Sequence, residues 1–242
     1  MSVVARVFPE SGSLVRRAME AVTGHIRAHH LRVGDTLPGE GHFSREMGVS
    51  RAVMREAFGA LAALKLIDVG NGRRPRVAAL DGSVMAASLD HAVSTAQVTI
   101  PDIWDVRRTI EQRTAALAAE HRSEEEARAI LALADAMTAD CGDFERMTQH
   151  DIAFHETIAR ASHNPLFVQI VASFGPMMEV AVPAAWRTRV ASRARDTMLA
   201  RHHAVARAIE ARDAAAAAAA MHAHFDESIA DILKADAAAG LS

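Results

Sequence analysis

Four side chains in the second half of the chain have the types and spacing that could bind a metal ion. Asp151 and His155 are four residues apart, so on a helix a carboxylate and an imidazole would project side by side. His202 and His224 fall where two further helices are expected, and antiparallel packing could bring them opposite this pair. One carboxylate with three imidazoles suits a divalent transition metal such as zinc, nickel, manganese or iron, with positions left for water or a ligand.

The same spacing also has simpler interpretations. An Asp and a His four residues apart more often form an ion pair on a helix surface. The chain has 13 histidines, and the neighbours His203 and His222 leave the choice of ligands open. Arg107 and Glu111 present a similar choice, between an ordinary ion pair along one helix and an arginine that points inward to hold a carboxylate.

The elements that must position these side chains are helices. After residue 80 the apolar positions recur with a helical period, and the alternating pattern of strands is essentially absent. We therefore expect an antiparallel all-helical bundle. A linker at residues 81–95 should precede helices over residues 102–121, 124–139, 143–161, 165–182, 192–211 and 213–235.

The stretch from Val49 to Leu66 has the features of a DNA recognition helix. Ser50 can cap its start, and Arg51 and Arg55 lie one turn apart on the first two turns. In a helix-turn-helix these turns of the second helix reach base edges in the major groove. An ordinary surface helix with two solvated arginines fits this stretch equally well on its own. The stripe expected to be buried consists of Val53, Ala57, Leu61 and Leu64.

The segments around this helix complete the pattern of a winged helix-turn-helix. One helix is predicted over residues 14–29. A second should start within residues 37–40, with Pro38 near its beginning and Glu40 in its first turn, and end near Met47, before a tight turn at Gly48 that leads into the recognition segment. After Leu66, two short β-like segments joined by a glycine-containing tip predict a hairpin wing whose arginines could reach the minor groove or phosphates. We expect the DNA contacts to come from Ser50, Arg51, Ala52, Val53, Arg55, Asn71, Gly72, Arg73, Arg74 and Arg76.

Composition supports a division into two domains. Residues 1–80 hold 12 Lys and Arg against 7 Asp and Glu, a net charge of +5, and residues 81–242 hold 15 against 23, a net charge of −8. A basic head is what phosphate contacts require. We expect a mainly α protein with a winged helix-turn-helix domain at residues 1–80 and a helical domain at residues 81–242.

Cysteine content and hydropathy indicate the cellular compartment of the protein. Cys141 is the only cysteine, which excludes an intramolecular disulfide and a cysteine-based zinc cluster. Nothing at the N-terminus resembles a signal peptide, and no apolar run approaches the roughly 20 residues of a spanning helix. We therefore expect a cytoplasmic protein with no membrane partner.

The head resembles the winged helix-turn-helix of GntR-family bacterial transcription regulators. The residues that carry the resemblance are Leu37 to Glu40, Val49 to Arg51, Arg55 to Ala57, Leu61 and the glycine-containing basic wing to Val77.

The body resembles the FCD ligand-binding domain of the FadR-like branch of that family. The matching residues are Val106 and Arg107 through Glu111, Ala118 and Ala119, Asp151 to His155, Asn164, His202, Ala208 and Ile209, and Asp213 to His224. In that family a metal is bound inside the bundle and small organic acids bind beside it. The resemblance therefore implies Asp151, His155, His202 and His224 as metal ligands, and Arg107 and Asn164 as effector-binding residues.

The head departs from the family pattern at several positions. Gly41 stands where the family commonly has an arginine that contacts DNA, and Lys65 replaces a common glycine. The wing has Arg73, Arg74 and Arg76 around Pro75 in place of glycine, threonine and an aromatic residue. We therefore expect the head to depend on Arg51, Arg55 and the wing arginines more than its relatives do.

The expected function is transcription regulation without enzymatic activity. A homodimer, expected to be a repressor of a metabolic operon, would bind double-stranded palindromic operator DNA and release it when a small organic or sugar acid binds beside the metal. Zinc is the first choice of metal, with nickel, manganese or iron as alternatives. The rival hypotheses are a metal-dependent enzyme acting on a hydroxy acid, since such a site can activate water, and a sensor of the metal itself.

Overall fold

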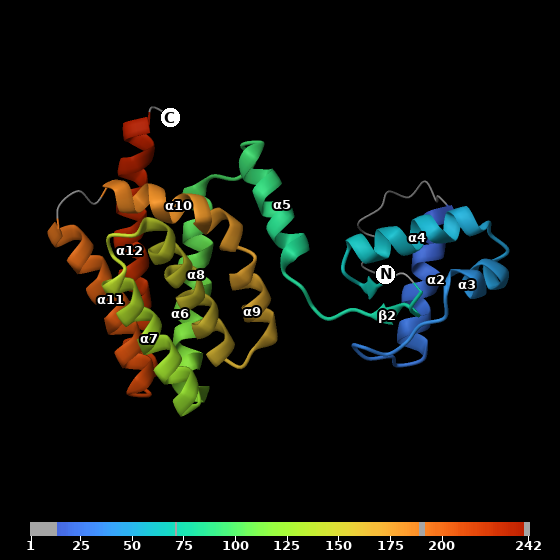
Figure 1. The fold of residues 1–242 in the computed structure, drawn as a ribbon, viewed down its shortest axis with the longest axis horizontal. Helices are drawn as coiled ribbons and strands as arrows, with labels where there is room; N and C mark the ends of the chain where they lie inside the picture. The colour runs from blue at the N-terminus through green and yellow to red at the C-terminus, as the bar shows by residue number, and fades with distance from the viewer. Residues whose placement is uncertain (1–13, 71, 189–191, 240–242) are drawn as a thin grey trace. The chain divides into compact units, whose positions relative to one another are not determined.

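The protein is mainly helical, and its contacts divide it into two units. The computed structural model describes residues 14–70, 72–188 and 192–239 (Figure 1). One unit extends to Val84 and the other begins at Met85. The first contains three described helices and a two-stranded sheet, and the second contains eight described helices.

The first unit is a helix-turn-helix. Helices α2 (Leu14–Ala28), α3 (Glu40–Met47) and α4 (Arg51–Ala63) pack against one another. Gly48 ends α3 in the left-handed conformation, with φ of 64°, which glycine adopts without the steric strain of a side chain. Ser50 then begins α4, because its hydroxyl accepts a hydrogen bond from the Val53 amide at 3.2 Å. These two residues produce the tight turn predicted between the helices.

The core of this unit forms around α4, but the buried stripe differs from the expected one. Ala57 and Leu61 are fully buried, as the helical period predicts, whereas Val53 and Leu64 are only half-buried. Their places are taken by Met54 and Phe58, which lie on the side of α4 that faces α2 and α3. The position of the partner helices rotates the buried face by one residue.

The wing is a short antiparallel hairpin. Strand β1 (Ile67–Asp68) pairs with β2 (Arg76–Val77), with Ile67 opposite Val77. Thr36 forms an isolated bridge with Arg76 on the other side of β2, so the segment before α3 also contacts the wing. Gly72, at the tip, has a φ of 71°. The predicted hairpin is confirmed, and each of its strands is shorter than the β-like segment that predicted it.

The second unit is a multi-helix bundle. Helix α6 contacts α8, α11 and α12, and α7 contacts α8 and α11, so helices far apart in the sequence lie side by side (Figure 1). The eight helices are α5 (Ser83–Ser94), α6 (Ile100–His121), α7 (Glu124–Ala139), α8 (Phe144–Ala161), α9 (Pro165–Ala172), α10 (Gly175–Thr188), α11 (Ser192–Glu210) and α12 (Ala214–Ala239).

Two of the predictions about helices are wrong. Residues 81–95, expected as a linker, contain α5, whose Leu89 and Val93 pack against the bundle core. The single helix expected over residues 165–182 is broken into α9 and α10. At the break the Ser173 hydroxyl donates a hydrogen bond to the Ile170 carbonyl at 2.6 Å. This bond competes with the backbone hydrogen bonds of a continuous helix. Gly175 then begins α10.

Within the described ranges, no single helix is both long enough and apolar enough to span a membrane. The broken pair Pro165–Ala172 and Gly175–Pro183, bent by 47°, meets those criteria only when its two parts are taken together.

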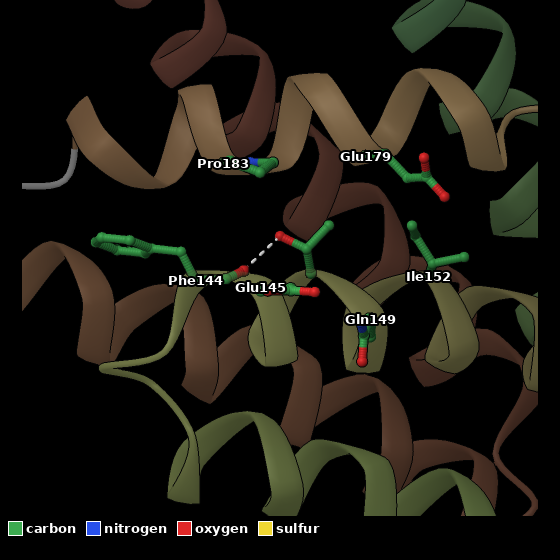
Figure 2. A pocket seen from close by; sticks show the side chains of 7 residues that line it. Phe144, Glu145, Gln149, Ile152, Glu179 and Pro183 are labelled. Atoms are coloured by element: carbon green, nitrogen blue, oxygen red, sulfur yellow. Dashed lines mark hydrogen bonds between the residues drawn. The ribbon is translucent and has the colours of Figure 1, made fainter.

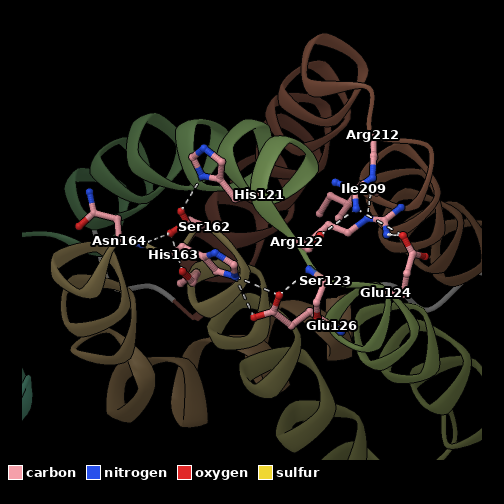
Figure 3. A network of polar contacts seen from close by, with 11 residues as sticks. His121, Arg122, Ser123, Glu124, Glu126, Ser162, His163, Asn164, Ile209 and Arg212 are labelled. Atoms are coloured by element: carbon pink, nitrogen blue, oxygen red, sulfur yellow. Dashed lines mark hydrogen bonds and ion pairs between the residues drawn. The ribbon is translucent and has the colours of Figure 1, made fainter.

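Arg122 joins the ends of two helices that carry candidate site residues (Figure 3). It follows α6 and is only 4% exposed. Its guanidinium donates to the carbonyls of Ile209 and Glu210 at the end of α11 and also contacts Glu124. Carbonyls at the C-terminal end of a helix carry partial negative charge, so a cation is favourable there. Arg122 therefore fixes α6 against α11.

Replacing Arg122 by Met is expected to lower the free energy of unfolding by about 1–3 kcal/mol. The apolar side chain keeps most of the packing but leaves the Glu210 carbonyl without its donor from Arg122, and it leaves the Ile209 carbonyl with only the Arg212 amide. Urea denaturation of the full chain measures the change. Arg128→Met is the matched control, because Arg128 is an exposed arginine of the next helix; an equal loss in both variants would contradict the role of Arg122.

Candidate metal centre

Helix α8 places a carboxylate and an imidazole inside the bundle. Asp151 and His155 share one face of α8 with Phe154 and Ile158, which are fully buried. The helical period therefore carries the two polar side chains into the core, where Asp151 is 7% and His155 3% exposed. The interpretation as an ion pair on the helix surface is excluded by this burial.

Two further imidazoles reach the same place from α11 and α12. His202 and His224 are 2% and 4% exposed. One ring nitrogen from each of His155, His202 and His224 lies within 4.8 Å of the other two. The ring centroids of His202 and His224 are 4.5 Å apart, and those of His155 and His224 are 5.2 Å apart. Three buried imidazoles thus form a cluster that could bind a metal.

Asp151 lies at the edge of this histidine cluster. Its Oδ1 is 3.0 Å from Nε2 of His202 and 4.0 Å from Nε2 of His155. The structure therefore brings together all four side chains that the resemblance implied as ligands. His203 forms a contact with Thr138, and His222 pairs with Asp226 on the surface of α12, so neither joins the cluster.

The hydrogen bonds of His202 test whether a metal ion fits. Nδ1 of His202 lies 3.0 Å from the Met198 carbonyl, which can only accept, so the network assigns the proton to Nδ1. In the neutral ring, Nε2 then presents a lone pair to Asp151 Oδ1 at 3.0 Å. Two acceptors this close require a proton or a cation between them. An imidazole and a carboxylate arranged in this way fit a shared divalent metal ion.

The electrostatics of the cluster favour the ligand forms of its residues. Burial alone would raise the pKa of Asp151, but the close contact with Nε2 of His202 and the neighbouring imidazoles outweigh that effect and hold the pKa well below its usual range. Burial, together with His202 and His155, holds the pKa of His224 well below 6.5. The carboxylate is therefore charged and His224 is neutral, which are the states that bind a metal.

Arg107 and Glu111 form a buried ion pair next to the cluster. Arg107 is 3% and Glu111 1% exposed, and Arg107 Nε donates to Glu111 Oε1 at 2.7 Å. The other oxygen of Glu111 contacts Nδ1 of His155. Burial alone would raise the pKa of Glu111, but Arg107 and His155 outweigh that effect and lower it. The ion pair along α6 is therefore observed, but inside the bundle, and the role of Arg107 in holding the carboxylate of an acid stays a prediction.

Aromatic rings surround the guanidinium of Arg107, which the sequence did not indicate. Its Cζ lies 5.0 Å from the ring centroid of Trp104, 5.1 Å from Phe225 and 5.9 Å from Phe174. A guanidinium packs favourably on aromatic faces. Nη1 contacts the sulfur of Met178. These residues come from α6, the turn before α10, α10 and α12, so no local spacing could have identified them.

Asn164 is not brought together with Arg107. Its side chain caps α9 by accepting a hydrogen bond from the Leu166 amide at 3.0 Å. Its own amide donates to Ser162, whose carbonyl contacts His121 at the end of α6 (Figure 3). Arg107 is 14 residues earlier on that helix, roughly 21 Å along its axis. The geometry gives Asn164 a capping role, and its effector role stays a prediction.

A separate pocket between α8 and α10 is unsuitable for an acid. It has a volume of about 490 Å³, and Glu145 and Glu179 are among the residues that line it (Figure 2). Two carboxylates repel an anion, whereas the surroundings of Arg107 attract one. The histidine cluster and Arg107 therefore remain the candidate acid site.

The predicted DNA contacts on α4 lie on the surface of the first unit. Arg51 and Arg55 are exposed on the first two turns of α4, as is Ala52, while Val53 is half-buried and Ser50 caps the helix. Arg55 Nε lies 3.9 Å from a carboxylate oxygen of Glu40 at the start of α3.

The predicted contacts in the wing are mostly exposed too. Gly72, Arg73 and Arg74 are exposed at its tip, and Asn71 lies outside the described residues. Arg76 Nη1 donates to the Gly34 carbonyl at 2.7 Å, so its side chain also braces the wing. Pro75, although beside three arginines, is buried.

The two units together define a transcription regulator, with a winged helix-turn-helix in one and a ligand-binding type of bundle in the other. The chain belongs to the GntR family of bacterial regulatory proteins, which matches residues 14–77, and it carries an FCD domain over residues 102–227. Membership in a family of bacterial regulatory proteins favours transcription regulation over the rival hypothesis of a metal-dependent enzyme.

Curated relatives include both activators and repressors. The chain is 32% identical over 153 residues to the Glc operon transcriptional activator of Escherichia coli K12, an alignment that covers 61% of this chain and 60% of that protein. It is 27% identical over 159 residues to the galactonate operon transcriptional repressor of the same strain, covering 63% of this chain and 69% of that protein. The alignment with the first of these thus spans less than two thirds of its length.

Solved structures show the same fold at low sequence identity. A GntR protein of Streptococcus agalactiae superposes with a TM-score of 0.62 at 19% identity, covering 89% of this chain and 99% of that one. The E. coli protein McbR/YncC superposes with a TM-score of 0.50 at 17% identity, covering 92% and 98%.

Lowering the pH from 7 to 5 is expected to destabilise the metal-free protein, with a contribution from His224. In the folded chain the pKa of His224 is well below 6.5, whereas the unfolded chain takes up a proton there near pH 6.5. The unfolded state binds more protons below that pH, so the free energy of unfolding falls as the pH falls. Urea denaturation with a chelator present measures this loss.

The variant His224→Gln isolates that contribution. Its free energy of unfolding should depend less on pH than that of the wild-type chain, while His91→Gln, at an exposed position, should leave the dependence unchanged. An identical pH dependence in wild type and His224→Gln would be the contrary result.

Proposed function

We propose that the protein is a homodimeric repressor that binds a palindromic operator and releases it when a small organic or sugar acid binds beside a divalent metal. The DNA-binding domain would comprise residues 1–80, and the effector- and metal-binding domain residues 81–242. The observation that carries this proposal is the buried cluster of His155, His202 and His224 next to Arg107, in a bundle joined to a helix-turn-helix.

The residues that would hold the metal are Asp151, His155, His202 and His224. Their nitrogen and oxygen donors suit zinc first, then nickel, manganese or iron. When bound, the ion supplies positive charge for the oxygens of an acid, in a place that excludes bulk water. The chain itself keeps the pKa of the Asp151 carboxyl and that of the His224 imidazole low, so at neutral pH these two side chains are in the forms that bind a metal.

Arg107 would hold the carboxylate of the acid. Its Nε is engaged by Glu111 and its Nη1 by Met178, but Nη2 has no hydrogen-bond partner in the described part of the chain. A guanidinium is always protonated and donates to carboxylates with fixed geometry. The rings of Trp104 and Phe225 hold it in place and keep water away, which strengthens the interaction with an anion.

The winged head would recognise the operator through two kinds of contact. Arg51 and Arg55 would reach base edges from α4, because they are exposed at the end of the helix that enters the major groove. Arg73 and Arg74 would contact phosphates or the minor groove from the wing. A two-fold dimer matches a palindrome, since each head would bind one half-site.

Release of DNA requires that the acid bind better to a conformation in which the heads do not fit the operator. Couplings of this kind are typically about 1–3 kcal/mol.

The galactonate operon repressor among the relatives makes galactonate the first acid to test. A DNA mobility shift with the protein's own promoter, with and without galactonate and other hydroxy acids, tests the proposal. No shift under any condition would refute it.

Two further measurements ask whether the protein represses or activates transcription, and whether the acid or the metal is the effector. Transcription in vitro distinguishes repression from activation, since the relatives include both activators and repressors. Titration of zinc without an acid tests whether the metal itself is the signal. A change in operator affinity with zinc alone would favour a metal sensor over an acid-responsive repressor.

Replacing Arg51 by Ala is expected to weaken operator binding by about 1–3 kcal/mol and to relax base preference at the position it contacts. The guanidinium is exposed on α4, so its loss should not affect folding. Fluorescence anisotropy with operator variants measures both effects. Arg128→Ala, which removes the same charge from the bundle, is the control, and an unchanged affinity in Arg51→Ala would contradict the assignment.

Replacing His155 by Ala is expected to remove the bound metal and the response to the acid, while operator binding remains. His155 belongs to the buried histidine cluster of the second unit, whereas the proposed DNA contacts belong to the first. Elemental analysis gives the metal content, and the mobility shift gives both DNA affinity and acid response. His91→Ala, at an exposed position, should behave as wild type. Stoichiometric metal in His155→Ala would count against the assignment.

A further inference from the structure

Glu111 is a buried carboxylate that is not among the proposed metal ligands. It is 1% exposed and projects from α6. Its two oxygens are divided, one accepting from Arg107 Nε at 2.7 Å and the other contacting Nδ1 of His155. A carboxylate is costly to bury unless both oxygens are satisfied. Glu111 is therefore held in place by the residue proposed for the acid on one side and a residue proposed for the metal on the other.

The contact with His155 fixes which nitrogen faces the cluster. An ionised carboxylate can only accept, so Nδ1 carries a proton, and in the neutral tautomer this selects, Nε2 has the lone pair. Nε2 is the nitrogen that lies 4.0 Å from Asp151. For His202 the carbonyl of Met198 has the same effect. Partners of this kind orient a metal-binding histidine and raise its affinity for the ion.

Glu111 also sets the net charge of the buried group formed by Asp151, Arg107, Glu111 and the three histidines, which we name the chamber. Among the described residues, those that are buried and charged around the cluster are Asp151, Glu111 and Arg107, and together they carry a charge of −1. The Arg122 guanidinium is also buried but lies at the opposite end of α6, about 22 Å from Arg107 along the axis. A divalent ion would bring the chamber to +1. One carboxylate neutralises that charge, whereas a second would leave an excess negative charge out of water.

We propose that Glu111 positions His155 and sets the charge of the chamber, so that the metal-loaded site accepts an acid with one carboxylate in preference to a dicarboxylate. This proposal depends on the metal and acid sites of the proposed function. It narrows the ligand class to monocarboxylic acids, such as a hydroxy acid or an aldonic acid.

The position of the proton on His155 is tested first, in the metal-free wild-type chain. Nitrogen-15 NMR of the ring, assigned by comparison with His155→Gln, should show the proton on Nδ1. A proton on Nε2 would overturn the positioning role. This measurement requires no change at Glu111, so it does not depend on the folding of a variant there.

Zinc affinity then tests the effect of Glu111 on the site. Competition with a chromophoric chelator should show that Glu111→Gln binds zinc about 10- to 100-fold more weakly than the wild-type chain. Glu111→Asp, which keeps the charge, should recover part of the affinity. Glu120→Gln, at an exposed position on the same helix, should bind as wild type. Equal zinc affinity in Glu111→Gln and wild type would contradict the proposal.

Selectivity for acids tests the charge argument with two matched pairs, lactate with malate and galactonate with galactarate. The zinc-loaded wild-type chain should bind the monocarboxylate of a pair about tenfold more tightly, measured by calorimetry. In zinc-saturated Glu111→Gln the chamber gains one positive charge, so the preference should shrink or reverse. A preference for the dicarboxylates in the wild-type chain would refute the ligand class.

The zinc and acid measurements distinguish a failure of the proposed function from a failure of the role assigned to Glu111. A wild-type chain that binds no zinc refutes the metal site of the proposed function. Zinc binding with the expected effect of Glu111→Gln, but no binding of any of the four acids, supports the positioning role and refutes the acid class. Zinc binding that is unaffected by Glu111→Gln leaves the metal site intact and refutes the role of Glu111.

Discussion

The structure of the second unit depends on the burial of charged groups that must satisfy one another. Asp151, Glu111 and Arg107 are all removed from water, and each is paired within a single chamber. An unpaired charge in that place would cost several kcal/mol. These side chains can pair only if α6, α8, α11 and α12 keep a fixed spacing. The packing of the bundle therefore determines whether the buried charges are satisfied.

The contacts outside the chamber maintain that spacing. Phe154 and Ile158 fill the core beside the ligands on α8, and Phe225 does so on α12 while also packing on Arg107. At the far end of α6, Arg122 fixes that helix to the end of α11. Helix α6 is thus held near its middle by the paired charges of Arg107 and Glu111, and at its C-terminal end by Arg122 on the carbonyls of α11. A shift of one turn would separate Glu111 from His155.

The first unit follows a different physical rule, because its functional charges are exposed. Arg51 and Arg55 need no partner in the protein, since water solvates them until DNA is bound. Its fold is set by local features, such as the Gly48 turn and the Ser50 cap, and by a small core around Phe43 and Phe58. These features are close together in sequence, which explains why the helix-turn-helix and its wing were predicted nearly as they are.

The sequence by itself determined the helical class, the head, its basic edge and the four residues of the proposed metal site, because those signals are periodic or lie in recognisable motifs. It did not determine the chamber around them. The second partner of Glu111 and the rings around Arg107 come from helices far apart in the chain, and α5 and the break before α10 depend on packing and a side-chain hydrogen bond. Burial decided these features, since the same Arg107 and Glu111 spacing would form an ordinary surface ion pair on a helix exposed to water.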